Sequence, residues 1–267
     1  RAGGLAASLT VTALCVTAAY TIALASAALR TGRPVLVSAL LLAAVVPASG
    51  DNWAPRPQTL ALPLFALLLA LLARARVRPR AALWLVPLCA LWSNVHGSFV
   101  LGPLVAGVSL AGGWLDARRG APSFAPRALR FAALCSVAAL AATCINPLGP
   151  RAWSYALALG RAPALRAFVS EWQPPSPFGL PDAYAHGLLG ATVLAALYGP
   201  RRGRAPPLAD VLPFLLAGAL SLAAVRNAVW LGLAALPVLS VALEARGTSL
   251  DACNEKTWAI SCHNVAC

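Results

Sequence analysis

The chain has few charged residues, and acidic residues are the scarcest of them. Charged side chains make up 11% of its 267 residues, with 8 acidic residues against 21 basic ones. In a soluble domain, charged residues normally make up roughly a quarter of the sequence. With 60% hydrophobic residues and a mean hydropathy of +0.74, this scarcity excludes an ordinary soluble domain. We therefore expect an all-α, polytopic membrane protein. Methionine is absent, even at position 1, so we also expect the N-terminus to be truncated.

Lysine is nearly missing as well. Lys256 is the single lysine, so the formal charge of +13 comes from arginines. These arginines separate apolar runs, as the anchoring residues of cytoplasmic loops do, and they do not gather into the basic face that a nucleic-acid partner needs. Abundant alanine, leucine and arginine are typical of a GC-rich bacterial genome. The chain also lacks a glycine-rich phosphate loop, a G-x-S-x-G elbow and an H-E-x-x-H motif.

The apolar runs predict a bundle of about nine membrane spans. One run, from Ala81 to Leu115, has no Asp, Glu, Lys or Arg and greatly exceeds the ~20 residues of a single crossing, so we expect it to form a hairpin. The other predicted spans are Gly4–Leu29, Pro34–Ser49, Thr59–Ala73, Phe131–Ile145, Ala183–Tyr198, about Pro207–Ala223 and about Val229–Leu243.

Arginines occupy every second loop of this arrangement. They are Arg30 and Arg33, Arg74 to Arg80, Arg118 to Arg130, Arg201 to Arg204, and Arg246. Because cytoplasmic loops carry the excess of basic residues, this alternation predicts a multi-pass protein of the bacterial cytoplasmic membrane. The N-terminus of the given sequence is expected outside, and the C-terminus in the cytoplasm.

Residues 1–246 are expected to form the membrane domain, and residues 247–267 a tail of different composition. The tail holds Cys253, Cys262, His263 and Cys267, whose spacing lacks the paired C-x2-4-C pattern of zinc sites. We interpret this tail as a foreign or frameshifted end.

The loops without an arginine cluster carry most of the remaining polar side chains. The turn of the predicted hairpin contributes two of them, Asn94 and His96, within the sequence from Trp92 to Ser98. The polar residues of these loops are Asp51, Arg56, Gln58, Asn94, His96, Asn146, Glu171, Gln173, Asp182, His186, Arg226 and Asn227. The sequence leaves open whether these twelve side chains line one shared external cavity.

The longest connection, from Arg151 to Asp182, has a pattern of its own. Its first half combines Trp153 and Tyr155 with arginines, which is typical of a helix that lies along the membrane surface. Gly160 and Pro163 are expected to break this helix in two. The second half is rich in proline and turns. The alternative is that the segment is a lid that covers the bundle.

Several of these segments, in this order, resemble bacterial proteins related to the GT-C glycosyltransferases. The resemblance rests on Arg56-Pro57-Gln58, Trp92-x-Asn94-x-His96-Gly97, Asn146-Pro147-x-Gly149, Glu171-Trp172 and Arg226-Asn227, and it covers about residues 50 to 245. It implies sugar transfer from a polyprenyl-phosphate donor at an external active site. It also implies an acidic residue in a first external loop, which is not seen in this chain.

Such a transfer needs a base for the acceptor hydroxyl and cations for the leaving phosphate. The candidate catalytic residues are Asp51, His96 and Glu171, and the candidate donor-binding residues are Arg56, Gln58, Asn94, Arg226 and Asn227. No metal ligands are predicted, although a divalent cofactor stays open.

Each candidate also has a structural alternative. Asp51 would pair with Arg56, Glu171 would pair with Arg166, and His96 would cap the hairpin turn. Arg56 and Arg226 would extend to lipid headgroups, and Asn146 would end a helix by turn chemistry.

Two other functions remain open at this point, a transporter or flippase and a non-catalytic membrane scaffold. A transporter is expected to show internal repeats and polar groups at mid-membrane depth, and neither is evident. Membrane lipids and a polyprenyl-phosphate sugar are the expected partners, and the sequence does not determine the oligomeric state.

Overall fold

A computed structural model describes residues 4–49, 53–176, 179–199 and 205–243. The candidate Asp51 and the predicted tail 247–267 lie outside these ranges. The described residues form helices and turns with no β-strand, which confirms the all-α prediction. The helices are α1 (Gly4–Thr31), α2 (Pro34–Leu40), η1 (Leu41–Val45), α3 (Val46–Ser49), α4 (Pro57–Ala75), η3 (Pro79–Trp84), α5 (Leu85–Val95), η4 (Gly97–Val100), α6 (Leu101–Arg118), α7 (Pro126–Ala142), α8 (Arg151–Arg161), α9 (Pro163–Phe168), η5 (Ser170–Trp172), α10 (Leu180–Tyr198), α11 (Leu208–Ala223), η7 (Val225–Asn227) and α12 (Ala228–Ala242).

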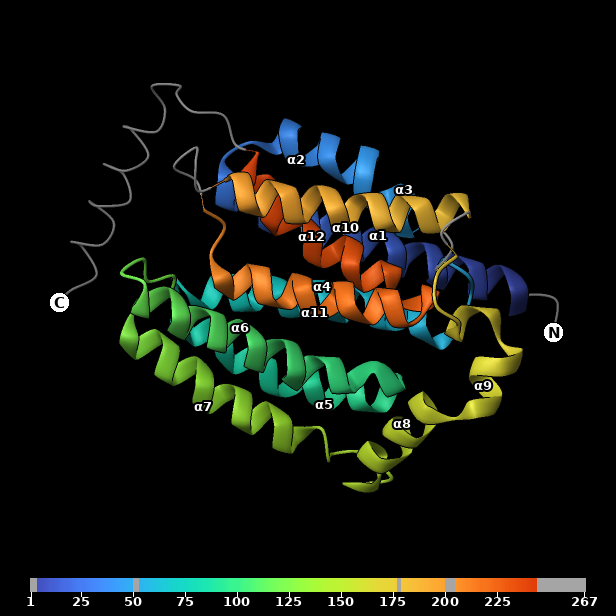
Figure 1. The fold of residues 1–267 in the computed structure, drawn as a ribbon. Coiled ribbons are helices and arrows are strands. Elements are labelled where there is room, and N and C mark those ends of the chain that lie inside the picture. Colours follow the sequence, from blue (N-terminus) through green and yellow to red (C-terminus); the bar gives the residue numbers. More distant parts are fainter. Residues whose placement is uncertain (1–3, 50–52, 177–178, 200–204, 244–267) are drawn as a thin grey trace.

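The long helices run back and forth along one bundle axis, as Figure 1 shows. The turns that follow α1, α4 and α6 gather at one end, which also holds the start of α11 and is called the Asp210 end here. The turns that follow α5, α7 and α11 gather at the opposite end, called the His96 end, where α8 and α9 also lie. Loops that alternate along the chain therefore lie at opposite ends of the bundle.

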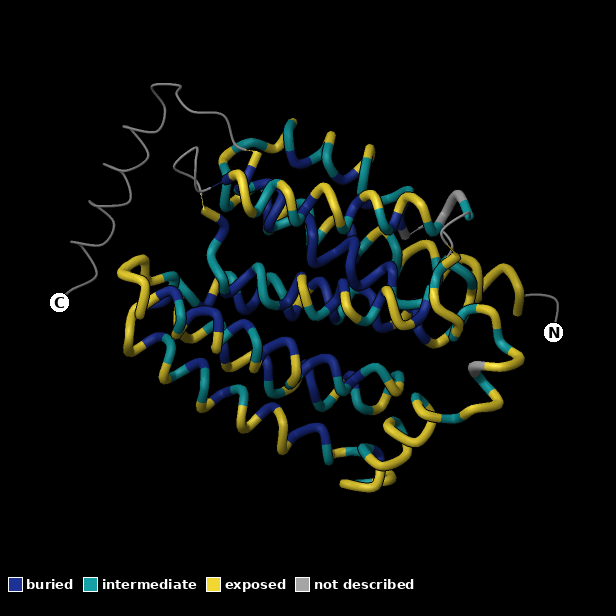
Figure 2. Tube along the Cα trace, in the orientation of Figure 1, coloured by how far each residue is buried: buried dark blue, intermediate teal, exposed yellow. Residues whose placement is uncertain are grey.

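Helix α12 is the centre of the bundle. It contacts α1, α2, α4, α10 and α11, and nearly all of its residues are buried (Figure 2). Beneath the His96 end, Trp230 of α12 packs against Phe65 and Trp92, with ring centroids 5.0 and 6.4 Å away. Fully buried aromatic rings contribute large apolar areas, so this trio fixes α4, α5 and α12 directly below the polar end.

Four described helical segments are long and apolar enough to cross a membrane. They are Gly4–Thr31, Pro57–Ala75, Gly97–Arg118 and Val225–Ala242. This gives the chain membrane character, but the predicted number of nine crossings is not supported. Most of the remaining predicted spans are helical but shorter or interrupted, whereas α10 has 19 residues and is still not among these four segments. For example, Pro34–Ser49 passes through a π-helical turn, and α5 spans 11 residues.

Several helices begin at a proline, and a proline inside α11 leaves one backbone carbonyl that needs a hydrogen-bond donor from another helix. Pro34, Pro57 and Pro126 occupy the first turns of α2, α4 and α7, where a missing N–H costs no hydrogen bond. Pro213 lies inside α11 and leaves the carbonyl of Ala209 without its helical donor. Ser109 Oγ of α6 donates to that carbonyl at 2.8 Å, which joins α6 to α11.

The segment after α7 is broken as its sequence predicts. Helix α8 ends at Arg161, Ala162 is extended, and α9 starts at Pro163. Trp153 anchors α8 to the bundle, since its Nε1 donates to Thr143 Oγ1 at 2.9 Å and its ring stands edge-on to Phe99 at 5.3 Å. Tyr155 and Leu157 of α8 are exposed. The segment is therefore tied directly to the hairpin turn.

Candidate functional site

Three segments that are distant in sequence meet at the His96 end and form a polar cluster. Arg56, extended immediately before α4, makes an ion pair with Glu171 of η5. Gln58 and Arg226 bond reciprocally: Gln58 Nε2 donates to the Arg226 carbonyl at 2.8 Å, and Arg226 Nη2 donates to Gln58 Oε1 at 2.6 Å. The residues Arg56, Gln58, Glu171, Trp172 and Arg226 are called the arginine cluster below.

Arg226 is held on a second side by an aromatic ring. Its guanidinium carbon lies 4.3 Å from the ring centroid of Trp172, a distance that gives a cation–π contact. The backbone N–H of Val225 donates to the carbonyl of Gln173 at 3.1 Å, which fixes η7 against the segment that carries Trp172. The planar guanidinium is thus oriented before any ligand binds, and such a fork matches the oxygens of a phosphate.

His96 lies between α5 and η4, where it caps the hairpin turn. Its Nδ1 accepts a hydrogen bond from the backbone N–H of Ser98 at 3.1 Å and contacts Ser98 Oγ at 2.8 Å. A backbone N–H can only donate, so Nδ1 carries no proton and the neutral ring has its proton on Nε2. His96 therefore presents a hydrogen-bond donor, and its predicted role as a base does not fit this geometry.

Burial, assisted by the nearby positive charge of Arg226, lowers the pKa of His96 from 6.5 to about 4. The unfolded chain consequently takes up a proton between pH 6.5 and 4 that the folded protein resists, so stability falls as the pH drops through this window. We expect a loss of roughly 2–3 kcal/mol between pH 7 and 4. Thermal unfolding in detergent across this range should show a steeper loss for the wild type than for His96→Gln, and equal slopes would contradict the assignment.

The two candidate asparagines serve helix ends. Asn94 Nδ2 donates to the carbonyls of Ala90 and Ile145, at 2.8 and 2.7 Å. Asn227 Nδ2 donates to the carbonyl of Leu220 at 2.9 Å, near the end of α11. Because both amides are used within the protein, their predicted role in donor binding has no support from these contacts.

Asn146 behaves as its structural alternative predicts. Its Nδ2 donates to the Thr143 carbonyl at 2.7 Å, and its Oδ1 accepts from the backbone N–H of Leu148 at 2.9 Å. Glu171 makes an ion pair with Arg56. The alternative partners suggested by the sequence, Asp51 for Arg56 and Arg166 for Glu171, lie outside the described part of the chain in one case and have no described side chain in the other. The polar residues of this end are therefore divided between an arginine cluster and helix-ending turns.

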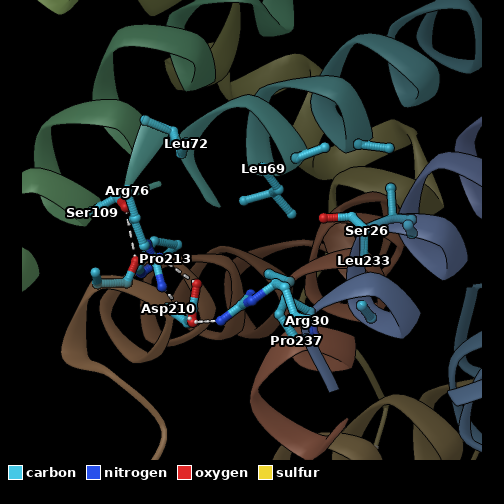
Figure 3. A pocket seen from close by; sticks show the side chains of 16 residues that line it. Ser26, Arg30, Leu69, Leu72, Arg76, Ser109, Asp210, Pro213, Leu233 and Pro237 are labelled. Atoms are coloured by element: carbon cyan, nitrogen blue, oxygen red, sulfur yellow. Dashed lines mark hydrogen bonds and ion pairs between the residues drawn. The ribbon is translucent and has the colours of Figure 1, made fainter. Parts of the chain in front are cut away.

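A second ionic cluster, at the Asp210 end, was missed by the sequence analysis. Asp210 in the first turn of α11 accepts two hydrogen bonds from Arg76, Nη2 to Oδ1 at 2.6 Å and Nη1 to Oδ2 at 3.0 Å, and it also pairs with Arg30 (Figure 3). Asp210 and Arg76 are 8% and 10% exposed, so the cluster is almost dry. The sequence feature that could have indicated this cluster is Asp210, a carboxylate just inside a long apolar run. Its partners Arg30 and Arg76 had been interpreted only as loop anchors.

A small cavity lies beside this ionic cluster, between α1, α4, α11 and α12 (Figure 3). Its volume is about 20 Å³, enough for about one water molecule. Arg76 Nε is buried at this place without a hydrogen-bond partner among the described residues. The ionic cluster joins the end of α1 and the residue that follows α4 to the start of α11.

Among the described residues, no three His, Cys, Asp or Glu side chains are grouped as ligands for a metal. No protein-family model, curated protein or solved structure matches the chain. Its function must therefore be inferred from the contacts described above.

Proposed function

We propose that the protein is a membrane glycosyltransferase-like enzyme that uses a polyprenyl-phosphate sugar at the His96 end. The observation that carries this proposal is the arginine cluster, in which Arg226 is held by Gln58 and Trp172 while Arg56 stands beside it with Glu171. Two arginines against one carboxylate leave a net positive charge. An anionic donor would be attracted to this end, and the fixed guanidinium of Arg226 would meet the charge that develops on the leaving phosphate.

The same proposal includes the location of the protein. In this arrangement the Asp210 end, which carries Arg30, Arg76 and Arg118, faces the cytoplasm of a bacterium, and the His96 end faces outward. A lipid-linked donor in the outer leaflet would then reach the arginine cluster from the side of the membrane, and α8 would lie at the outer surface.

In the proposed reaction an acceptor hydroxyl oxygen bonds to the anomeric carbon of the sugar. The bond from that carbon to the phosphate oxygen breaks, and its electron pair leaves with polyprenyl phosphate. Glu171 is held by Arg56, and His96 presents an N–H, so neither is an unoccupied proton acceptor in the arrangement described. Glu171 instead keeps Arg56 in place until the donor phosphate competes for its guanidinium.

Arg226→Lys is the variant that tests this proposal. Lysine keeps the positive charge but loses the planar fork that bonds Gln58 and stacks on Trp172. We expect sugar transfer from polyprenyl-phosphate donors in proteoliposomes to fall by about 10²–10³-fold, the usual effect of removing a fixed donor to a developing charge. Arg127→Lys, at an exposed position at the start of α7, is the matched control and should retain full transfer.

Equal transfer by the wild type and Arg226→Lys would remove this arginine from the reaction. If the wild type shows no transfer from any polyprenyl-phosphate sugar, the proposed function itself fails, and transport of the same lipids across the vesicle membrane becomes the activity to measure.

A further inference from the structure

A second small cavity lies between α10 and α11, close to the arginine cluster. Its lining includes Pro175, Asp182, His186, Ser221 and Val225, and its volume is about 10 Å³. This space accommodates a single group of the size of a water molecule or a hydroxyl. Two of the lining side chains, Asp182 and His186, are ionisable groups for which the proposed function has so far given no role.

The proton of His186 is placed by one hydrogen bond. Its Nδ1 lies 2.7 Å from the backbone carbonyl of Asp182, one helical turn earlier in α10. A carbonyl only accepts, so Nδ1 carries the proton and Nε2 of the neutral ring keeps its lone pair. Nε2 has no hydrogen-bond partner among the described residues. His186 is thus the opposite of His96, whose Nδ1 accepts and whose Nε2 donates.

The other polar groups that line the cavity also offer lone pairs. Ser221 Oγ donates its proton to the Gly218 carbonyl at 2.7 Å, so its oxygen is left as an acceptor toward the cavity. The carboxylate of Asp182 is an acceptor by nature, and the backbone N–H of Ser176 holds it at 2.7 Å. A ligand that suits such a lining must donate a hydrogen bond, and the volume admits little more than a hydroxyl.

The cavity and the arginine cluster share the segments that form them. Val225 lines the cavity, and the next residue, Arg226, stacks on Trp172. The hydrogen bond from Val225 to Gln173 lies between the two sites, and Pro175 lines the cavity two residues beyond Gln173. Consecutive Cα atoms are about 3.8 Å apart, so the residue that lines the cavity, Val225, and the residue that carries the guanidinium, Arg226, are direct neighbours in the chain.

From this geometry we propose that the cavity is the acceptor subsite, where an alcohol hydroxyl binds and His186 Nε2 removes its proton. The inference rests on the proposed function and supplies the base that it lacks. As the hydroxyl oxygen bonds to the anomeric carbon, its proton moves to Nε2, and the electron pair of the broken carbon–oxygen bond stays with the polyprenyl phosphate beside Arg226. The imidazolium then releases its proton to water.

The ring nitrogen of His186 that carries the proton can be identified without an activity assay. The chain has three histidines, so 15N NMR of the histidine-labelled full chain, with single-histidine variants for assignment, resolves each ring. We expect His186 to be protonated at Nδ1 and His96 at Nε2 at pH 8. We also expect diethyl pyrocarbonate, which attacks an unprotonated ring nitrogen, to modify His186 several-fold faster than His96. A proton on Nε2 of His186 would overturn the inference.

His186→Asn tests the role in transfer. The asparagine amide can still donate to the Asp182 carbonyl, but it has no basic nitrogen in the cavity. We expect transfer to fall by about 10²–10⁴-fold, the usual contribution of a general base, with the KM for the lipid donor changed less than twofold. Tyr184→Phe, at an exposed position of the same helix, is the control that should retain transfer.

The possible outcomes separate the two proposals. Transfer by His186→Asn at the wild-type rate would overturn the role of His186 while the proposed function stands. A wild-type protein that transfers no sugar would overturn the proposed function and the proton-transfer step together, and the NMR result would still decide whether the cavity presents a lone pair. An unfolded variant, detected by its thermal unfolding profile, is replaced by His186→Gln, for which the same loss of transfer is expected.

Discussion

Replacing Asp210 with asparagine is expected to lower the free energy of unfolding by about 3–5 kcal/mol, the usual cost of leaving a buried charge without its partner. Arg76 is 10% exposed and gives both of its terminal nitrogens to this carboxylate, and Arg30 adds a second positive charge. Asparagine cannot compensate either charge, so the ends of α1, α4 and the start of α11 would lose the contact that joins them. Thermal or denaturant unfolding in detergent measures the loss.

Two variants bracket this prediction. Arg127→Gln, at an exposed position, should change stability by less than about 0.5 kcal/mol. The double variant Asp210→Asn, Arg76→Gln should recover part of the loss, because it removes one of the two charges that Asp210→Asn strands. If Asp210→Asn were as stable as Arg127→Gln, the ionic cluster would not hold the helices together.

Gly112→Ala is expected to cost about 3 kcal/mol, near the upper end of the range for overpacked interiors. A Cβ at residue 112 of α6 would lie 2.3 Å from the carbonyl oxygen of Leu208 and 2.6 Å from the backbone nitrogen of Ala209. Backbone atoms cannot move aside as a flexible side chain can. Helix α11 would therefore have to move away from α6.

The same displacement would weaken a helix cap. Asp116 Oδ1 accepts from the backbone N–H of Leu208 at 2.9 Å, and its Oδ2 accepts from that of Ala209 at 3.3 Å. A carboxylate stabilises the positive end of a helix dipole, and Gly112 permits the approach that this cap requires.

Gly107→Ala is a matched control on the same helix. A Cβ there would meet nothing within 4 Å, and alanine favours a helix over glycine by up to about 1 kcal/mol. We therefore expect Gly107→Ala to be neutral or slightly stabilising. Equal unfolding curves for Gly107→Ala and Gly112→Ala would show that α6 and α11 do not pack as closely as described.

Helix placement was predictable because it depends on local properties. Long apolar runs, first-turn prolines and the break near Pro163 all act within a few residues of where they stand, so α1, α4, α8 and α9 follow from sequence patterns. The number of nine crossings did not follow, because hydropathy sums composition over a window and does not detect the π-helical turn inside Pro34–Ser49.

The grouping of polar residues at the His96 end was predicted in part. Alternating loops place Arg56, Glu171 and Arg226 at the same end of the bundle, and the structure brings these three together. Asn94 and Asn227 lie at the same end, but their amides bond nearby backbone carbonyls. Only the contacts of the folded chain distinguish an asparagine that ends a helix from one that faces a ligand.

The Asp210 cluster and the two histidines show what depends on tertiary structure alone. Arg30 and Arg76 have the pattern of loop anchors, and nothing local indicates that both reach the same carboxylate in α11. Likewise, His96 and His186 are the same residue type, and a single hydrogen bond at Nδ1 decides which ring donates and which accepts. The helical class and the spacing of arginines along the chain could be predicted from the amino-acid sequence, because they depend on residues that are close together in it. The ion pairs, the cavities and the ring tautomers could not, because each depends on atoms from segments that meet only in the folded protein or on the direction in which a side chain is held.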